Sequence, residues 1–146
     1  MTAFSIVLVL NLLWFAEAFR YFTLRPDTAT KLLVPKSARQ SPLFATVRAT
    51  VTFIGGFNLS LAVLSLLLLI FGSLFPSPQQ NAIFAITFAV AHGSQFACNL
   101  PVLRGGGRQG ESLWDVRSGP MLFIFVVDFV LMLANAAFAA YFMLAR

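Results

Sequence analysis

The sequence has little charge, one cysteine and one histidine. Charged residues make up 10% of the 146 positions, against roughly 25% in a soluble domain. So few charges cannot cover a water-facing surface, which argues against a soluble enzyme, a disordered tail and a nucleic-acid-binding domain. Cys98 alone cannot form an internal disulfide, and His92 alone cannot supply a metal site built from several histidines. We therefore predict no metal and no cofactor.

Hydrophobic residues, by contrast, make up 59% of the chain, and seventeen residues are phenylalanine. They form four apolar segments, at 3–22, 44–75, 81–100 and 120–145. Each has about the 20 residues that a membrane-spanning helix needs. The segments are continuously apolar and lack the alternation of a membrane β-barrel. We predict an all-α integral membrane protein, a four-helix up-down bundle in which residues 1–146 form a single domain.

Local features support this division. No Lys or Arg precedes the first apolar segment, so we expect a retained helix rather than a signal peptide. Pro101 is expected to end the third helix, and Gly119 and Pro120 to begin the fourth. Residues 105–110 are rich in glycine but follow a membrane helix instead of a strand, so they predict a flexible loop rather than a phosphate site.

The basic residues are concentrated in two connections. Nine of the ten lie between positions 20 and 48 or between 104 and 117, and only Arg146 lies elsewhere. The connection between the second and third segments, 73–80, has no charge. Because positive charge accumulates on the cytoplasmic side, we predict that connections 23–43 and 101–119 are cytoplasmic and that both termini lie outside.

Polar residues within the apolar segments are candidates for function, because burying them in hydrocarbon is costly. The candidate intramembrane polar site consists of Glu17, Arg48, Asn58, His92, Gln95, Asp128 and Asn135. His92 and Asp128 each lie about eight residues from the basic end of their helices, near 12 Å deep at 1.5 Å per residue. We therefore predict that they face each other. The pair is either a structural brace or a functional pair that handles protons or lines a ligand pocket.

The other charges allow simpler interpretations. Glu17 and Arg20, three residues apart, are expected to form an interfacial ion pair. Arg48 is expected to extend toward lipid headgroups. The small or polar residues of the second segment recur on one helix face, which predicts a close helix contact; they are Arg48, Gly55, Asn58, Ala62 and Ser65. No set of residues in this chain is predicted to be catalytic.

Two short stretches resemble a known group of membrane proteins. Residues Val47–Thr50, which lead into Gly55–Asn58, and Ala91–Gly93 in the third segment resemble a pattern in small four-helix proteins. These are the DoxX-like group and the ergosterol-biosynthesis scaffold family. The resemblance covers the second and third helices. It implies a non-catalytic partner that holds membrane enzymes together, or an accessory to a redox complex.

A second resemblance is to the membrane-associated glutathione and eicosanoid enzymes. These are also four-helix chains of similar length with a basic first connection. Their second helix has Arg-Ala followed by His, Asn and Glu, whereas here Arg48 and Ala49 are followed by Thr50, Val51 and Thr52. The departure argues against glutathione chemistry.

Taken together, these features predict a non-catalytic accessory or scaffold subunit. It would lie in the lipid bilayer. There it would either pack against another membrane protein or a second copy of itself, or bind a lipid-like molecule. The alternative is a small membrane enzyme or transport-like protein that uses Glu17, His92 and Asp128. A third possibility is a haem- or pigment-binding subunit with His92 as ligand. A water-accessible pocket around His92 and Asp128 would favour the enzyme or transporter, and a closed core would favour the scaffold.

Overall fold

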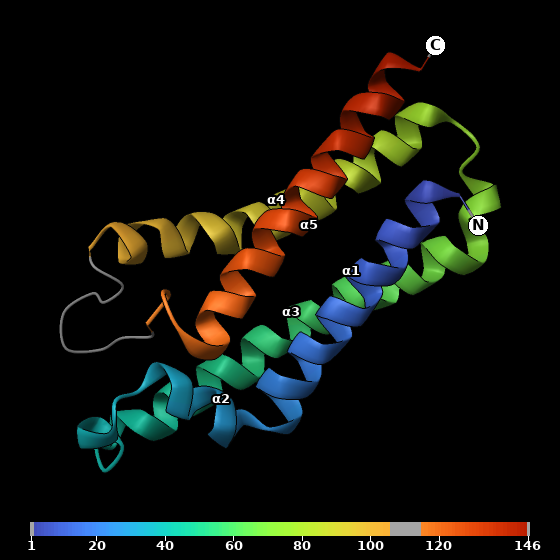
Figure 1. Ribbon diagram of the computed structural model, residues 1–146. Coiled ribbons are helices and arrows are strands. Elements are labelled where there is room, and N and C mark those ends of the chain that lie inside the picture. The colour runs from blue at the N-terminus through green and yellow to red at the C-terminus, as the bar shows by residue number, and fades with distance from the viewer. Residues whose placement is uncertain (1, 106–114, 146) are drawn as a thin grey trace.

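The computed structural model describes residues 2–105 and 115–145, and all the regular structure within them is helical (Figure 1). This confirms the predicted fold class. The elements are α1 (Ala3–Phe19), the π-helix η1 (Arg20–Leu24), α2 (Pro26–Leu33), the 3₁₀ turn η2 (Lys36–Ala38), α3 (Leu43–Phe71), the 3₁₀ turn η3 (Gly72–Leu74), α4 (Pro78–Arg104) and α5 (Gly119–Leu144).

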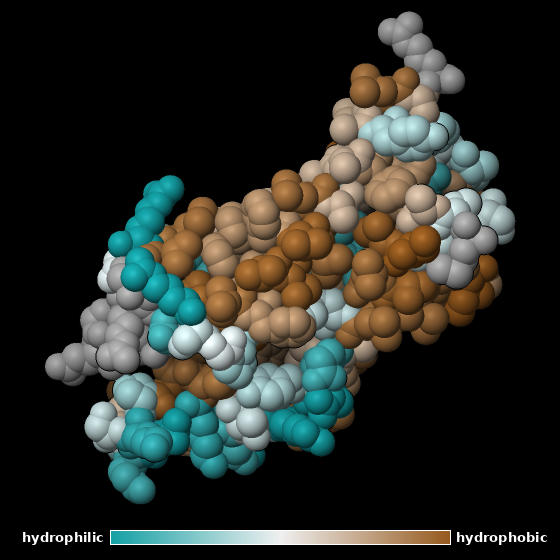
Figure 2. Space-filling view, viewed as in Figure 1, coloured by the Kyte–Doolittle hydropathy of each residue, from teal (hydrophilic) through white to brown (hydrophobic). Residues whose placement is uncertain are grey.

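Four helical segments within the described residues are long and apolar enough to cross a membrane: Ala3–Leu24, Leu43–Leu74, Pro78–Arg104 and Gly119–Leu144. Figure 2 shows hydrophobic side chains over the middle of the visible face, with hydrophilic ones gathered at one end. That end carries α2, the start of α3 and the end of α4, and we call it the basic end. The chain is a multi-pass membrane protein.

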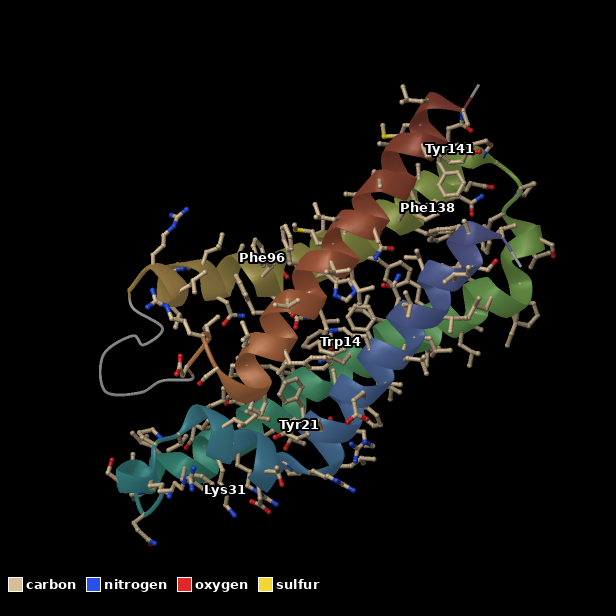
Figure 3. The ribbon with its side chains drawn as sticks, viewed as in Figure 1. Trp14, Tyr21, Lys31, Phe96, Phe138 and Tyr141 are labelled. Carbon is tan, nitrogen blue, oxygen red and sulfur yellow. The ribbon has the colours of Figure 1, made fainter. Side chains whose placement is uncertain are left out.

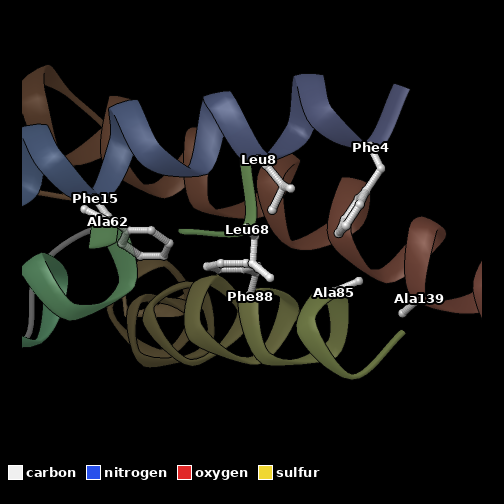
Figure 4. Close-up of a cluster of buried hydrophobic side chains, with 8 residues drawn as sticks. All are labelled: Phe4, Leu8, Phe15, Ala62, Leu68, Ala85, Phe88 and Ala139. Carbon is white, nitrogen blue, oxygen red and sulfur yellow. The ribbon is translucent and has the colours of Figure 1, made fainter. Parts of the chain in front are cut away.

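The spanning helices form two pairs. α1 packs along α3, and α4 packs along α5 (Figure 1). Phe96 of α4 stacks on Phe125 of α5 with ring centroids 4.7 Å apart. The pairs meet over an apolar core to which all four helices contribute (Figure 4), formed by Phe4, Leu8, Phe15, Ala62, Leu68, Ala85, Phe88 and Ala139.

The predicted contact face of α3 is confirmed for four of its five residues. Gly55, Asn58, Ala62 and Ser65 are all buried, and a Cβ at Gly55 would lie only 2.0 Å from Thr23 Oγ1. Small residues let the two backbones approach this closely.

The first connection contains a short helix that the sequence did not indicate. α2 begins with Pro26, has Asp27 in its first turn and Lys31 in its last, an arrangement that suits a proline-started helix and its dipole. Ala29 and Thr30 are fully buried. The helix therefore packs against the bundle and does not merely connect α1 to α3.

The prediction that Pro101 ends the third helix is wrong. α4 continues to Arg104 with Pro101 inside it, and the Gly105 N–H donates to the Pro101 carbonyl at 2.9 Å. Proline removes one hydrogen bond, but its fixed φ is compatible with a helix. Val102 is 1% exposed, and its burial holds the last turn in place. The predicted glycine loop falls at 105–110, of which 106–110 lie outside the described residues.

Candidate functional site in the bundle interior

Five side chains from three helices form a hydrogen-bonded group that we call the polar cluster: Asn11 and Trp14 of α1, His92 of α4, and Asp128 and Asn135 of α5. The predicted contact between His92 and Asp128 is present, with Nδ1 2.9 Å from Oδ1. Both side chains are 0% exposed. The cluster lies between the two helix pairs and links α1 to α4 and α5.

Trp14 completes the surroundings of Asp128. It lies near the middle of the bundle (Figure 3), and its Nε1–H donates to Asp128 Oδ1 at 3.0 Å. Asp128 Oδ1 is thus contacted by both Trp14 and His92. Among the residues that the structure describes, the other carboxylate oxygen, Oδ2, is buried without a hydrogen-bond partner.

Two asparagines form a reciprocal amide pair. Asn11 Nδ2 donates to Asn135 Oδ1 at 3.0 Å, and Asn135 Nδ2 donates to Asn11 Oδ1 at 3.1 Å. Asn135 Nδ2 also donates to the Leu131 carbonyl at 2.8 Å. Asn11 Oδ1 lies 3.1 Å from His92 Nε2, so the amide pair is joined directly to the imidazole. Phe15 stacks on that ring, with centroids 4.7 Å apart and planes at 21°.

Two of the predicted site residues lie at the basic end, away from the polar cluster. Glu17 forms the expected ion pair with Arg20, whose Nε lies 2.6 Å from Glu17 Oε2. Arg48 is exposed, and its Nε donates to Asp27 Oδ1 of α2 at 2.7 Å. Arg48 is therefore not part of the buried face of α3. Its acidic partner comes from a helix that was not predicted.

Two amides are also separate from the cluster's hydrogen bonds. Asn58 lies on the buried face of α3, but its Nδ2 donates to the Ile54 carbonyl of its own helix at 3.3 Å. Gln95 is partly buried and lines two cavities. The predicted site residues are thus divided among the polar cluster, the ion pairs at the basic end, the buried face of α3 and a separate cavity lining.

The two cavities lie between the helix pairs at the basic end, with volumes of about 210 and 280 Å³. Phe22, Leu32, Gln95 and Ile124 line both of them. We call the two together the basic-end cavity. Trp14, which contacts Asp128, also lines the first. A separate groove of about 780 Å³ lies at the opposite end, beside the first turns of α1 and the last turns of α5.

The polar cluster has limited chemical possibilities. Both ring nitrogens of His92 are hydrogen-bonded, so neither can ligate haem without breaking a contact. Within the described residues there is no group of three or more His, Cys, Asp or Glu that could hold a metal ion. The arrangement can brace the helices and hold a proton.

Sequence reasoning missed Trp14, which was not among the predicted site residues. The available signal was its spacing of three residues from Asn11, which places both side chains on one face of α1. Comparison of the chain with protein-family models, curated proteins and solved structures finds no match.

Proposed function

We propose that this protein is a non-catalytic membrane subunit that holds a lipid-like molecule in its basic-end cavity. The carrying observation is the position of that cavity between the two helix pairs and next to the polar cluster, with which it shares Trp14. Its lining combines α1, η1 and α2 on one side with α4 and α5 on the other. A ligand there would contact both pairs.

The chemistry of the lining favours an apolar chain. Tyr21, Phe22, Leu32, Phe123 and Ile124 are all aromatic or aliphatic. Gln95 and Glu17 supply polar groups at the edge. Ligand sites are typically apolar with a few polar groups and occupy roughly 300–1,000 Å³. The volumes of the two neighbouring cavities, which share four lining residues, together fall in that range.

The charge around the cavity favours an anionic headgroup. Nine of the ten basic residues lie in or beside the connections at this end, with only four acidic ones. Glu17 and Asp27 are paired with Arg20 and Arg48, and Arg25 also acts on Glu17 electrostatically, so the balance of charge at this end stays positive. Basic residues next to a spanning helix attract anionic lipid by about 1 kcal/mol each.

The closed polar cluster supports this proposal over the alternative of an enzyme or transporter. His92 and Asp128 are 0% exposed, whereas a reaction or transport step at this pair would require access for substrate or water. Both nitrogens of His92 and one oxygen of Asp128 are already engaged within the protein. The cluster is then a brace that positions the cavity walls.

Fluorescence of Trp14 tests the proposal, because this indole lines the cavity. The chain has two tryptophans, so a Trp114→Phe background leaves Trp14 as the only indole. The purified protein in mild detergent is titrated with brominated phosphatidylglycerol, which quenches nearby indoles. We expect saturable quenching at about one lipid per chain, and weaker binding of brominated phosphatidylcholine.

A pair of alanines on α1 provides the matched control. Ala18 lines the cavity, whereas Ala16 is exposed and lies outside that lining. Ala18→Phe should abolish the saturable quenching, and Ala16→Phe should retain it. Quenching that rises without saturation, or that is the same in both variants, would contradict a specific lipid site.

A further inference from the structure

The hydrogen bonds of the polar cluster determine where its protons are, beginning at a backbone carbonyl. The Leu131 oxygen can only accept, so the Asn135 side-chain atom 2.8 Å from it must be the amide nitrogen. Asn135 therefore presents its oxygen to Asn11, 3.0 Å away. That oxygen in turn requires a donor, so the facing atom of Asn11 is its Nδ2.

The orientation of Asn11 determines one nitrogen of His92. With Nδ2 turned to Asn135, the Asn11 oxygen lies 3.1 Å from His92 Nε2. An amide oxygen has no proton to donate. Nε2 must therefore carry a hydrogen, because two facing lone pairs would repel each other in the bundle interior.

The other nitrogen faces Asp128. The indole N–H of Trp14 and Nδ1 of His92 both lie within 3.0 Å of the same oxygen, Oδ1. Oδ1 accepts the indole hydrogen, and an ionised carboxylate oxygen accepts it more strongly than the hydroxyl oxygen of a protonated carboxyl, so this contact favours the shared proton on Nδ1. We propose that His92 is an imidazolium, protonated at both nitrogens, and that the polar cluster is a proton-holding site paired with the Asp128 carboxylate.

Two further observations support a cationic ring. Phe15 lies parallel to His92 at a centroid distance of 4.7 Å, within the range in which an aromatic face attracts a cation. The pair of opposite charges is also neutral overall. Loss of this proton from the pair to solvent would leave Asp128 charged in hydrocarbon, with its Oδ2 unpartnered.

The site holds its proton and has no onward path through side chains. Within the part of the chain that the structure describes, the hydrogen bonds of the cluster reach no third ionisable residue. Glu17, three residues beyond Trp14 on α1, is paired with Arg20. This inference does not depend on lipid binding, since it rests on the cluster alone.

Nitrogen-15 NMR tests the proposal directly, because the chain has a single histidine and labelling that residue type gives one ring. The purified protein is measured in detergent at about pH 8, where an exposed histidine is mostly neutral. We expect both ring nitrogens to show an attached hydrogen. A bare nitrogen at either position in the parent protein would overturn the proposal, and this measurement needs no variant.

Two variants test its cause. Asn135→Leu removes the residue that orients Asn11, and isosteric Asp128→Asn removes the counter-charge. Each should leave only one ring nitrogen protonated. Asn58→Leu is the control, because Asn58 is also a buried amide but, within the described residues, donates to its own helix and not to the polar cluster; it should retain the doubly protonated ring. Retention of that state in Asp128→Asn would show that the carboxylate does not hold the proton.

Discussion

Replacing Gly55 by alanine should destabilise the protein at the contact between η1 and α3. The new Cβ would lie 2.0 Å from Thr23 Oγ1, 3.0 Å from Thr23 N and 3.2 Å from Phe22 Cβ. The hydroxyl can rotate away, but it would then lose its hydrogen bond to the Thr52 carbonyl, now 3.2 Å long. The backbone nitrogen cannot rotate, so the two helices must separate.

The magnitude follows from these two losses. Overpacking typically costs about 1–3 kcal/mol, and the lost hydrogen bond about 0.5–1.5 kcal/mol. A gain of up to about 1 kcal/mol comes from the higher helix propensity of alanine. The neighbouring Gly56 isolates the contact, because a Cβ there would meet nothing within 4 Å, and Gly56→Ala has the same propensity gain.

The measurement is thermal unfolding in a mild detergent. The unfolding free energy of Gly55→Ala should be lower than that of Gly56→Ala by about 1.5–4.5 kcal/mol. At roughly 2–4 °C per kcal/mol for a chain of this size, the difference is at least roughly 3 °C. Adding Thr23→Ala should reduce the loss, because it removes the clashing hydroxyl. Equal melting temperatures for the two glycine variants would refute the close packing of η1 on α3.

Three other predictions follow from the fold. His92→Ala and Asp128→Ala should each cost at least about 1–3 kcal/mol in unfolding free energy because each leaves a buried polar partner without its hydrogen bond, and the double variant should cost less than the sum; additive losses would contradict the pairing. In a cysteine-free background, a cysteine at Ser37 should be protected from an impermeant reagent in intact cells and one at Ser77 should react; the reverse pattern would invert the predicted orientation. Ala62→Phe should lower detergent heat resistance, by about 1–3 kcal/mol, since Ala62 is 4% exposed; unchanged resistance would place that face against lipid.

Depth and spacing along the helices predicted much of the interior. His92 and Asp128 were predicted to face each other because counting residues inward from the basic end of each helix gives the same depth in the membrane for both. The same count gives Asn58 and Asn135 similar depths in the membrane, but depth alone does not specify the direction in which a side chain points. The Asn58 amide donates its hydrogen bond to the Ile54 carbonyl of its own helix. Asn135 instead bonds across the bundle to Asn11.

The basic end was harder to predict because its contacts depend on α2. Arg48 was expected to extend to headgroups, but Asp27 of α2 lies within 2.7 Å of it. The short helix has too few apolar residues to stand out in a hydropathy pattern. Trp14 was missed for a different reason: its indole is mostly apolar, and only its single N–H makes the polar contact.

The division into two helix pairs has a consequence for biosynthesis. α1 and α3 enter the membrane before α4 and α5 have been made, yet Asn11 finds its partner in Asn135, 124 residues later in the chain. At 5–20 residues per second, that delay is roughly 6–25 s. During this time Asn11 lies without the α5 partner that it has in the folded protein. We expect nascent chains stopped before Asn135 to be recognised by membrane quality control and degraded, while full-length chains escape once the second pair docks.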